Sequence, residues 1–385
     1  MALRRTRRHP LLNKSSLFAP SKDCYFPAMT IRAPLAGPSV WLGQDIKDSR
    51  RWIRDLPAEA LDELDAAVKS VRGMPWQEIT REDFALPMLS DLLDDVSDEL
   101  ENGCGIVKLR GIPVDGYSED ELRQMYFGLG THIGTPVFQN RSGELMRAIR
   151  DEGAHVGRTY GETKDEKGST FLSSYARTLT NGGLRFHTDR TDVVGLLCVR
   201  QARAGGVSKL ASTPAIHNAI LAKRPDLLEL LFQDYWRSRF GEEGTKKDGE
   251  ATTRETAYPL PIFGLRDGKF TSHYSLTFIE AAQMAPDVPK LTDAQREAID
   301  LLMQTAEELC FEMTLAPGEL QLINSHVTYH GRTPFEDDAA SGHDRLLLRL
   351  WLTMRNNRPL PEGHEILWQE IEAGRPRGGI RQVAV

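Results

Sequence analysis

The spacing of apolar residues along the chain predicts a mixture of helices and short strands. We expect five helices, over residues 58–71, 86–100, 118–129, 214–223 and 292–309. Ser118 and Glu121 have the spacing of a capping box, in which two side chains satisfy free N–H groups at the start of a helix. Thr292 and Gln295 repeat that spacing before the last of the five segments.

Eight further segments have the pattern of short strands. They cover residues 105–110, 171–175, 193–200, 208–211, 262–265, 269–274, 318–323 and 345–354. The dipeptide Asp267-Gly268 separates two of them and is a strong signal for a hairpin turn. Many short strands, with helices toward the N-terminal end and in insertions, indicate an antiparallel barrel or a jelly roll.

The first 28 residues differ in composition from the rest of the chain. They hold six basic residues against a single acid, Asp23. No apolar stretch follows the arginines, so the segment lacks the pattern of a secretory signal. Three interpretations stay open: a disordered basic tail, an organellar transit peptide, or codons placed ahead of a true start at Met29.

Composition excludes several classes of protein. The net charge of −7 argues against a general nucleic-acid binder, which needs an excess of basic residues. The longest uninterrupted apolar run, residues 193–199, is far shorter than the ~20 residues of a membrane span. The four cysteines (Cys24, Cys104, Cys198 and Cys310) form no CxxC pair, which fits a reducing compartment. We therefore expect a soluble cytoplasmic protein, or an organellar one if the N-terminal segment is a transit peptide.

Two histidine-containing segments could hold a metal ion. His187 and Asp189 are two residues apart, so in an extended segment their side chains project to the same side. The second segment, residues 324–332, contains His326 and His330. Two histidines and one carboxylate form the facial triad that binds non-haem iron(II) and leaves positions open for other ligands. An HxD tripeptide alone is weak evidence for such a site.

Four motifs in this order make the case more specific. They are FHTD at residues 186–189, AGGVS at 204–208, HGR at 330–332 and RLLLRLWL at 345–352. With them the chain resembles the taurine dioxygenase (TauD/TfdA-like) family of iron(II)- and 2-oxoglutarate-dependent oxygenases. The resemblance covers about residues 103–354. It implies a double-stranded β-helix (jelly roll) with flanking helices, an α+β fold with a mainly β core.

The resemblance also implies a role for individual residues. His187, Asp189 and His330 match the iron ligands of the family. Ser208 stands where the family usually has a threonine that hydrogen-bonds 2-oxoglutarate. Arg345 matches the arginine that binds the distal carboxylate of that cosubstrate. We expect one catalytic domain over residues 29–385, with a mobile loop near residues 237–258.

The pattern of the last strand agrees with these roles without the resemblance. Arg345, Arg349 and Trp351 alternate with leucines, so they share one face, and the two arginines are about 13 Å apart at ~3.3 Å per residue. Arginines in an apolar strand need partners. Two bound anions would supply them, and we assign Arg349 to an anionic group of the primary substrate. Alternatively, Glu319 or Asp344 pairs with these arginines inside the fold.

We therefore predict a dioxygenase that oxidises, by preference hydroxylates, a C–H bond of a small anionic molecule, with dioxygen as its other substrate. The alternative is a cupin-like jelly roll that binds metal, or hydrolyses a substrate, without oxygenase activity. We expect no nucleic-acid or membrane partner, and a homo-oligomer stays open. Among weaker candidates, Gln139 and Arg141 fit a surface loop better than a pocket entrance, Asn324 could bond near the cosubstrate, and His326 should not be a ligand.

Overall fold

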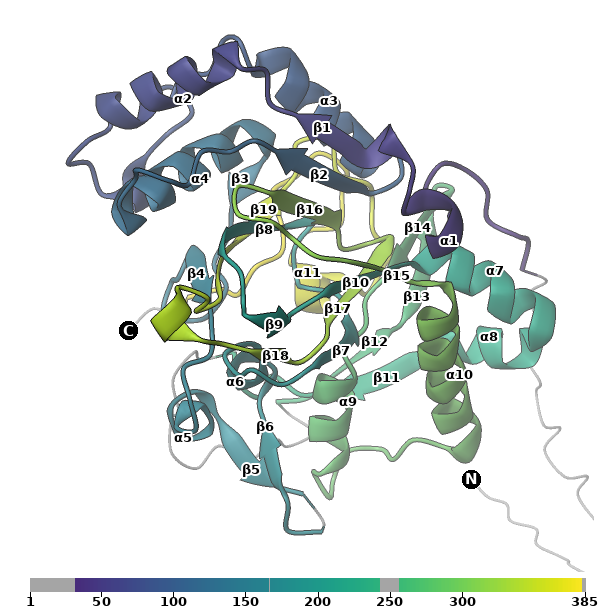
Figure 1. Ribbon diagram of the computed structural model, residues 1–385. Helices are drawn as coiled ribbons and strands as arrows, with labels where there is room; N and C mark the ends of the chain where they lie inside the picture. The colour runs from purple at the N-terminus through teal and green to yellow at the C-terminus, as the bar shows by residue number, and fades with distance from the viewer. Residues whose placement is uncertain (1–31, 166, 243–255, 383–385) are drawn as a thin grey trace, which may run out of the picture. The chain divides into compact units, whose positions relative to one another are not determined.

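Two mainly antiparallel β-sheets form the core of the computed structural model, which describes residues 32–165, 167–242 and 256–382 (Figure 1). The predicted tail over residues 1–28, and most of the predicted loop over residues 237–258, lie outside the described residues. The larger sheet has the strand order β1-β2-β16-β8-β19-β3, and β4 also pairs with β19. Its strands are β1 (Ile53–Asp55), β2 (Ile106–Arg110), β3 (Thr135–Pro136), β4 (Met146–Ile149), β8 (Val193–Arg200), β16 (Leu320–Asn324) and β19 (Leu346–Thr353).

The smaller sheet has the strand order β15-β10-β17-β7. Its strands are β7 (Leu184–His187), β10 (Ser208–Ser212), β15 (Phe311–Met313) and β17 (Thr328–Arg332). Val194 and Trp351 of the larger sheet lie in one buried apolar cluster with Leu210 and Phe311 of the smaller sheet. The two sheets therefore pack face to face, as the sequence predicts.

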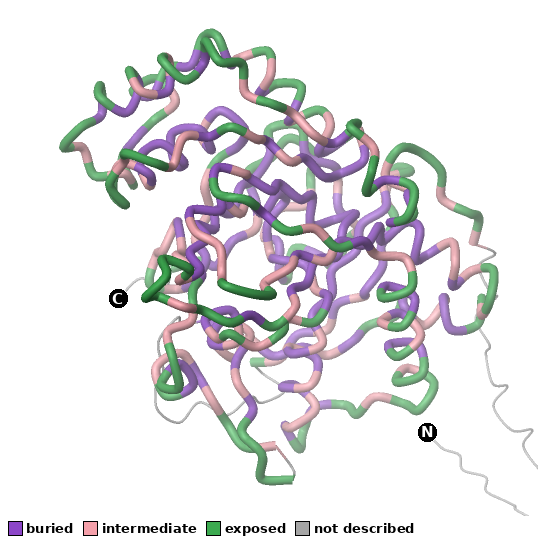
Figure 2. The backbone as a smooth tube through the Cα atoms, viewed as in Figure 1, coloured by how far each residue is buried: buried purple, intermediate pink, exposed green. Residues whose placement is uncertain are grey.

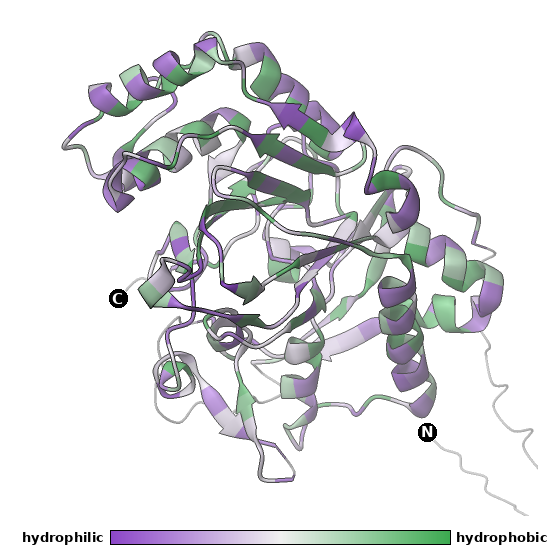
Figure 3. Cartoon of the chain, in the orientation of Figure 1, coloured by the Kyte–Doolittle hydropathy of each residue, from purple (hydrophilic) through white to green (hydrophobic). Residues whose placement is uncertain are grey.

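Three helices cover the outer face of the larger sheet (Figure 1). They are α2 (Glu59–Ser70), α3 (Ser90–Glu101) and α4 (Glu119–Ile133). Each helix is amphipathic, with apolar and polar faces that are visible in Figure 3. Leu64, Val96 and Leu129 from these helices are buried in one cluster with Leu348 and Leu350 of β19. This packing supports the outer face of β19, which contains Arg349 and directly follows Arg345.

A second group of helices packs beside the smaller sheet. It comprises α7 (Thr213–Lys223), α8 (Pro225–Leu231), α9 (Leu276–Gln283) and α10 (Asp293–Leu309). Ile216, Leu228 and Leu302 of these helices are buried in one cluster with Ala211 and Tyr329 of the sheet. In Figure 2 the buried residues concentrate in the sheets, while exposed residues follow the outer faces of the helices.

Shorter elements connect these parts. They are α1 (Gly43–Ile46), α5 (Val156–Tyr160), α6 (Ser174–Thr178), α11 (Glu365–Trp368), β5 (Glu162–Lys164), β6 (Thr170–Leu172), β9 (Ala204–Gly205), β11 (Asp234–Arg237), β12 (Tyr258–Pro261), β13 (Phe263–Arg266), β14 (Lys269–Ser272), β18 (Phe335–Glu336) and three 3₁₀ helices (Arg50–Trp52, Trp76–Glu78 and Ala339–Ser341). Within the described part of the chain, no helix has both the length and the apolar character that crossing a bilayer requires.

The local signals in the sequence are largely confirmed. Both capping boxes are present, at the starts of α4 and α10. Asp267 and Gly268 connect β13 to β14 with positive φ angles of 52° and 75°, the conformation of a tight hairpin turn.

Three predicted boundaries were wrong by three or four residues. The strand expected over residues 171–175 ends at Leu172, because the Ser173 side chain accepts a hydrogen bond from the Ala176 N–H and starts α6. The helix expected over residues 86–100 begins only at Ser90. Finally, α4 continues beyond its expected end to Ile133.

Candidate active site

Neighbouring strands of the smaller sheet bring the two candidate histidine ligands together. His187 ends β7, and His330 lies in the middle of β17, directly opposite His187 in the antiparallel pair. Their ring centroids are 4.2 Å apart. Asp189 follows two residues after His187, as the HxD pattern predicts. Of the described residues, only these three form a group whose ligand atoms could share one metal ion, with all three atoms within 4.8 Å of one another.

The distances within this group fit metal binding better than direct hydrogen bonding. Nε2 of His187 lies 3.9 Å from Oδ1 of Asp189, and Nε2 of His330 lies 3.8 Å from Oδ2 of the same carboxylate. Both separations are too long for hydrogen bonds. The three side chains therefore face a shared point without hydrogen-bonding to one another. Two imidazoles and one carboxylate are the donor set of a facial triad.

The histidine ring nitrogens that would bind a metal are free to do so. Nδ1 of His187 lies 2.9 Å from the carbonyl oxygen of Arg185. As a donor to that oxygen, Nδ1 carries the proton and leaves the lone pair of Nε2 available. Burial lowers the pKa of His330 to about 3, so its ring is neutral near pH 7. Neutral imidazole nitrogens are what a metal requires of its histidine ligands.

Asp189 is held as an anion by four neighbours. Burial alone would raise the pKa of its carboxyl, but the charge of Arg349, together with the two candidate histidines and a hydrogen bond from Trp351, outweighs burial, so the pKa is lowered. The indole Nε1 of Trp351 donates a 3.0 Å hydrogen bond to Oδ2 of Asp189. Sequence reasoning placed Trp351 on the same strand face as the arginines but gave it no role.

Arg349 is fixed by Gln139, which lies between β3 and β4, the two strands that pair with β19 at the edge of the larger sheet. Its Nε donates a 2.7 Å hydrogen bond to Oε1 of Gln139, whose amide donates back to the carbonyl oxygen of Arg349 at 2.9 Å. Gln139 is only 1% exposed, so its assignment to a surface loop was wrong. Gln139 therefore holds Arg349 in place, and Arg349 in turn lies near Asp189.

The alternative that Glu319 or Asp344 pairs with the strand arginines was wrong. The Glu319 carboxylate lies 3.2 Å from Nζ of Lys108, and the Asp344 carboxylate pairs with Arg200 at 2.7 Å. Neither acid reaches Arg345 or Arg349.

Arg345 instead lines a cavity together with Ser208, His330 and a second buried arginine, Arg332. Arg345 is 6% exposed, and its buried Nη1 has no hydrogen-bond partner among the described residues. Burial lowers the pKa of Arg345 to about 10. Burial and the nearby Arg345 lower that of Arg332 to about 9. Both guanidinium groups lie against the ring of Phe335, at 5.0 and 4.9 Å. Neither cation pairs with a carboxylate in the part of the chain that the structure describes, so the two fit the anionic end of a dicarboxylic cosubstrate.

Comparison with known proteins decides the family. The family model described as "Taurine catabolism dioxygenase TauD, TfdA family" matches residues 55–351. The chain belongs to the TauD/TfdA family. It is similar to FR-33289 synthase of Streptomyces rubellomurinus, with 30% identity over 341 residues, which is 86% of this chain and 94% of that protein. It is also similar to the taurine hydroxylase-like protein SAT17 of Stachybotrys chartarum, with 26% identity over 355 residues, covering 90% of this chain and 86% of SAT17.

Solved structures share the fold. A structure of asparagine oxygenase in complex with Fe(II), 3-hydroxyasparagine and succinate aligns with a TM-score of 0.59 at 18% identity, over 79% of this chain and 94% of that chain. The non-heme iron oxygenase OrfP, in complex with Fe and alpha-ketoglutaric acid, aligns with a TM-score of 0.54 at 15% identity, over 78% and 94% of the two chains. The predicted jelly roll is thereby confirmed. Membership of the TauD/TfdA family confirms the predicted class, an iron(II)- and 2-oxoglutarate-dependent oxygenase.

A second pocket of this TauD/TfdA family member shares His187 and Arg349 with the cavity at Arg345, and we call it the substrate-side pocket. Its lining includes Gln139, Tyr175, Arg190, Glu242, His273, Arg349, Trp351, Leu367 and Ile380. The carboxylate of Glu242 lies 2.9 Å from Arg190, 3.8 Å from Arg141 and 3.6 Å from Arg239. The lining itself holds two arginines, Arg190 and Arg349, and two carboxylates, Asp189 and Glu242.

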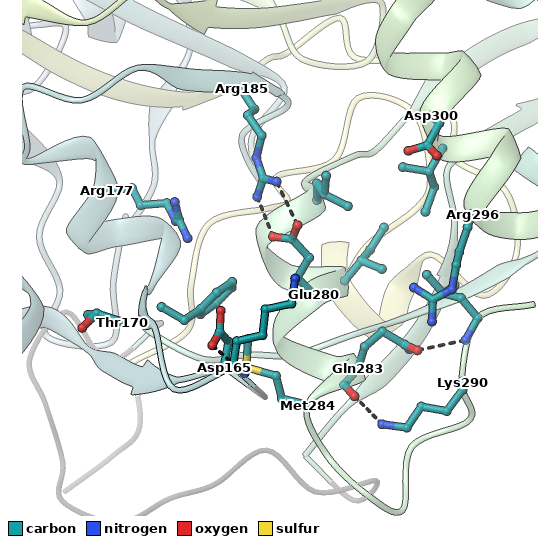
Figure 4. Close-up of a pocket in the computed structure, with 16 residues that line it drawn as sticks. Asp165, Thr170, Arg177, Arg185, Glu280, Gln283, Met284, Lys290, Arg296 and Asp300 are labelled. Carbon is teal, nitrogen blue, oxygen red and sulfur yellow. Dashed lines mark hydrogen bonds and ion pairs between the residues drawn. The ribbon is translucent and has the colours of Figure 1, made fainter. Parts of the chain in front are cut away.

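The strand that carries His187 is anchored on its outer side. The guanidinium of Arg185 donates to both carboxylate oxygens of Glu280 on α9, at 2.9 and 2.6 Å (Figure 4). This pair lies in a cleft of about 740 Å³ between β6, α9 and α10. Ser275, directly before α9, forms a β-bridge with His187. The ion pair and the bridge together fix the end of β7 at the ligand position.

Two weaker candidates, Asn324 and His326, make contacts away from the candidate ligand group. The amide of Asn324 donates to the carbonyl oxygen of Leu100 and to Glu101, so the suggested bond near the cosubstrate was wrong. His326 is not part of the ligand group. Its Nε2 lies 2.9 Å from the fully buried carboxylate of Asp192.

Proposed function

We propose that this chain oxidises a C–H bond of a small anionic organic molecule, coupled to decarboxylation of 2-oxoglutarate to succinate and carbon dioxide. In this proposal His187, Asp189 and His330 hold iron(II), because two neutral imidazoles and one anionic carboxylate face a shared point. Iron(II) with 2-oxoglutarate supplies the activation of dioxygen and the oxidising power. The chain binds, orients and shields the reactants.

In the proposed arrangement Arg345 holds the distal carboxylate of 2-oxoglutarate. Its unpartnered, buried guanidinium is the single observation that carries this assignment. Ser208 lines the same cavity and can donate its hydroxyl to the same carboxylate. Arg332 adds a second positive charge beside Arg345, which strengthens the field that a carboxylate would meet.

We assign Arg349 to an anionic group of the primary substrate. Arg349 lines both the cosubstrate cavity and the substrate-side pocket, and Gln139 holds it in place. Asparagine oxygenase and OrfP were solved with hydroxylated amino acids bound, which supports a small polar substrate here as well. A cytoplasmic location and a homo-oligomeric state stay predictions.

Oxygen uptake tests the proposal against the cupin-like alternative. Purified protein would be loaded with iron(II) and 2-oxoglutarate and given taurine, L-asparagine, L-arginine or phenoxyacetate in turn. We expect succinate formation that needs both iron(II) and 2-oxoglutarate, and that at least one of these anionic or zwitterionic compounds stimulates. The His187→Ala variant is the matched control. A protein that binds metal but neither consumes oxygen nor forms succinate would support the cupin-like alternative.

A further inference from the structure

His273 presents an unused hydrogen-bonding group to the substrate-side pocket. It lies directly after β14, is 3% exposed, and lines that pocket together with Arg349 and Trp351. Its position relative to the metal ligands is fixed, because Ser275, two residues later, bridges to His187. Neither the facial triad nor the proposed cosubstrate site uses this ring.

A short chain of hydrogen bonds determines which ring nitrogen of His273 carries the proton. The backbone N–H of Tyr274 donates to Oγ1 of Thr188 at 3.0 Å. That hydroxyl lies 3.1 Å from Nδ1 of His273 but 3.4 Å from the carbonyl oxygen of Tyr274, which already accepts the Thr188 N–H at 2.8 Å. Because Nδ1 is the nearer of these two acceptors, we assign the hydroxyl proton to the bond with Nδ1 and the ring proton to Nε2.

The surroundings of His273 keep its ring neutral. Burial lowers the pKa, and the charges of Arg237 and Arg190 lower it further, as do the nearby His364 and His326. A neutral ring with Nδ1 engaged by Thr188 has one remaining polar group, the Nε2–H donor, which has no partner in the described part of the chain.

We propose that His273 is a specificity-determining residue whose Nε2–H donates a hydrogen bond to an oxygen of the substrate's anionic group. Arg349 supplies the charge for that group, and His273 supplies a directed donor from the lining of the same pocket. The matching ligands are small organic oxyanions, such as sulfonates, phosphonates or carboxylates. This inference rests on the proposed function and names the group that would select the substrate.

Binding of two near-isosteric probes tests the role. Methanesulfonate and dimethyl sulfone have almost the same shape, but only the first is an anion. Their dissociation constants would be measured by calorimetry on the iron(II)- and 2-oxoglutarate-loaded enzyme without oxygen, with methylphosphonate and acetate as further anions. We expect wild-type protein to prefer methanesulfonate.

Two substitutions at position 273 separate the proposed donor from packing. His273→Gln places an amide N–H near the position of Nε2, whereas the shorter His273→Asn reaches only the position of Nδ1. We expect the Asn variant to weaken methanesulfonate binding about tenfold or more, and the Gln variant to stay within about threefold of wild type. His364→Gln, at another buried histidine, is the matched control and should leave the affinity unchanged.

A nuclear magnetic resonance measurement checks the tautomer independently. In ¹⁵N-histidine-labelled, zinc-substituted protein, we expect His273 to be neutral with its proton on Nε2. A proton on Nδ1 would overturn the inference. The inference would also be overturned if the His273→Gln, His273→Asn and wild-type proteins bound methanesulfonate with equal affinity while Arg349→Met lost binding. If Arg349→Met also binds like wild type, or wild type binds none of the anions, the anionic substrate of the proposed function fails as well.

Discussion

The indole of Trp351 and the carboxylate of Asp189 are joined by a 3.0 Å hydrogen bond, although 162 positions separate them along the chain. Trp351 lies on β19 of the larger sheet, whereas Asp189 follows β7 of the smaller sheet. The bond therefore links the two sheets of the jelly roll at the candidate metal site. It restrains the rotation of the only acidic member of the candidate triad.

Replacing Trp351 by Phe should weaken iron(II) binding. The change removes the donor to Asp189 but keeps an aromatic ring, and loss of such a supporting bond typically lowers metal affinity about 10- to 100-fold. Anaerobic titration with iron(II) would measure the loss. Trp41→Phe is a matched control, because its indole donates to the carbonyl oxygen of Cys104 instead. A Trp351→Phe affinity equal to that of wild type would contradict the role of this bond.

Replacing Arg345 by Ala should raise the Michaelis constant for 2-oxoglutarate. A buried carboxylate that loses its cationic partner loses roughly 2–5 kcal/mol of binding, which is about 30-fold or more in affinity. Arg200→Ala, at a half-exposed arginine paired with Asp344, should change the constant less than about twofold. A normal constant in Arg345→Ala would move the cosubstrate carboxylate elsewhere, with Arg332 as the next candidate.

Replacing Gln139 by Leu should affect the primary substrate and spare the cosubstrate. Leucine cannot accept the hydrogen bond from Nε of Arg349, so that guanidinium loses its fixed orientation. We expect the Michaelis constant for the primary substrate to rise about tenfold, while uncoupled decarboxylation of 2-oxoglutarate continues. Gln139→Glu keeps the acceptor oxygen and should restore part of the loss. Equal damage to both constants would indicate a shifted strand instead.

Replacing His364 by Gln should flatten the dependence of stability on pH. Burial lowers the pKa of His364 to about 4, whereas a histidine in the unfolded chain titrates near 6.5. Between these values only the unfolded chain binds the proton, so the free energy of unfolding falls as the pH falls. From about pH 7 to about pH 5 this group accounts for roughly 2 kcal/mol. Urea unfolding of both proteins at the two pH values measures the difference, and equal slopes would argue against a neutral, buried His364.

Short-range patterns were sufficient to predict the HxD pair and the strand face with the arginines, whereas His330 was assigned as the third ligand through the resemblance to the family. His187 and Asp189 are neighbours in sequence, and Arg345, Arg349 and Trp351 follow the two-residue period of a strand. The same local rules predicted the capping boxes and the hairpin turn. Each of these features depends on residues a few positions apart, so no knowledge of the tertiary fold was needed.

The supporting contacts could not be predicted in this way. Gln139 bonds Arg349 across 210 positions, and Thr188 meets His273 across 85 positions. No local period relates such residues, because only the pairing of β19 with β4 and the bridge at His187 bring them together. Arg332 was visible within the HGR motif, but its burial beside Arg345 follows from the packing of the two sheets.

The position of β7 at the edge of the smaller sheet links metal binding to local unfolding. β7 pairs only with β17 in that sheet, through His187 and Leu184, with an irregular register between the two pairs. An ion bound by His187 and His330 is therefore a cross-link between an edge strand and its neighbour. Since a ligand that binds only the closed form stabilises it by mass action, opening of β7 becomes rarer as the metal concentration rises. Amide hydrogen exchange in β7 would then slow with metal concentration, while exchange in the central strands of the larger sheet stays the same.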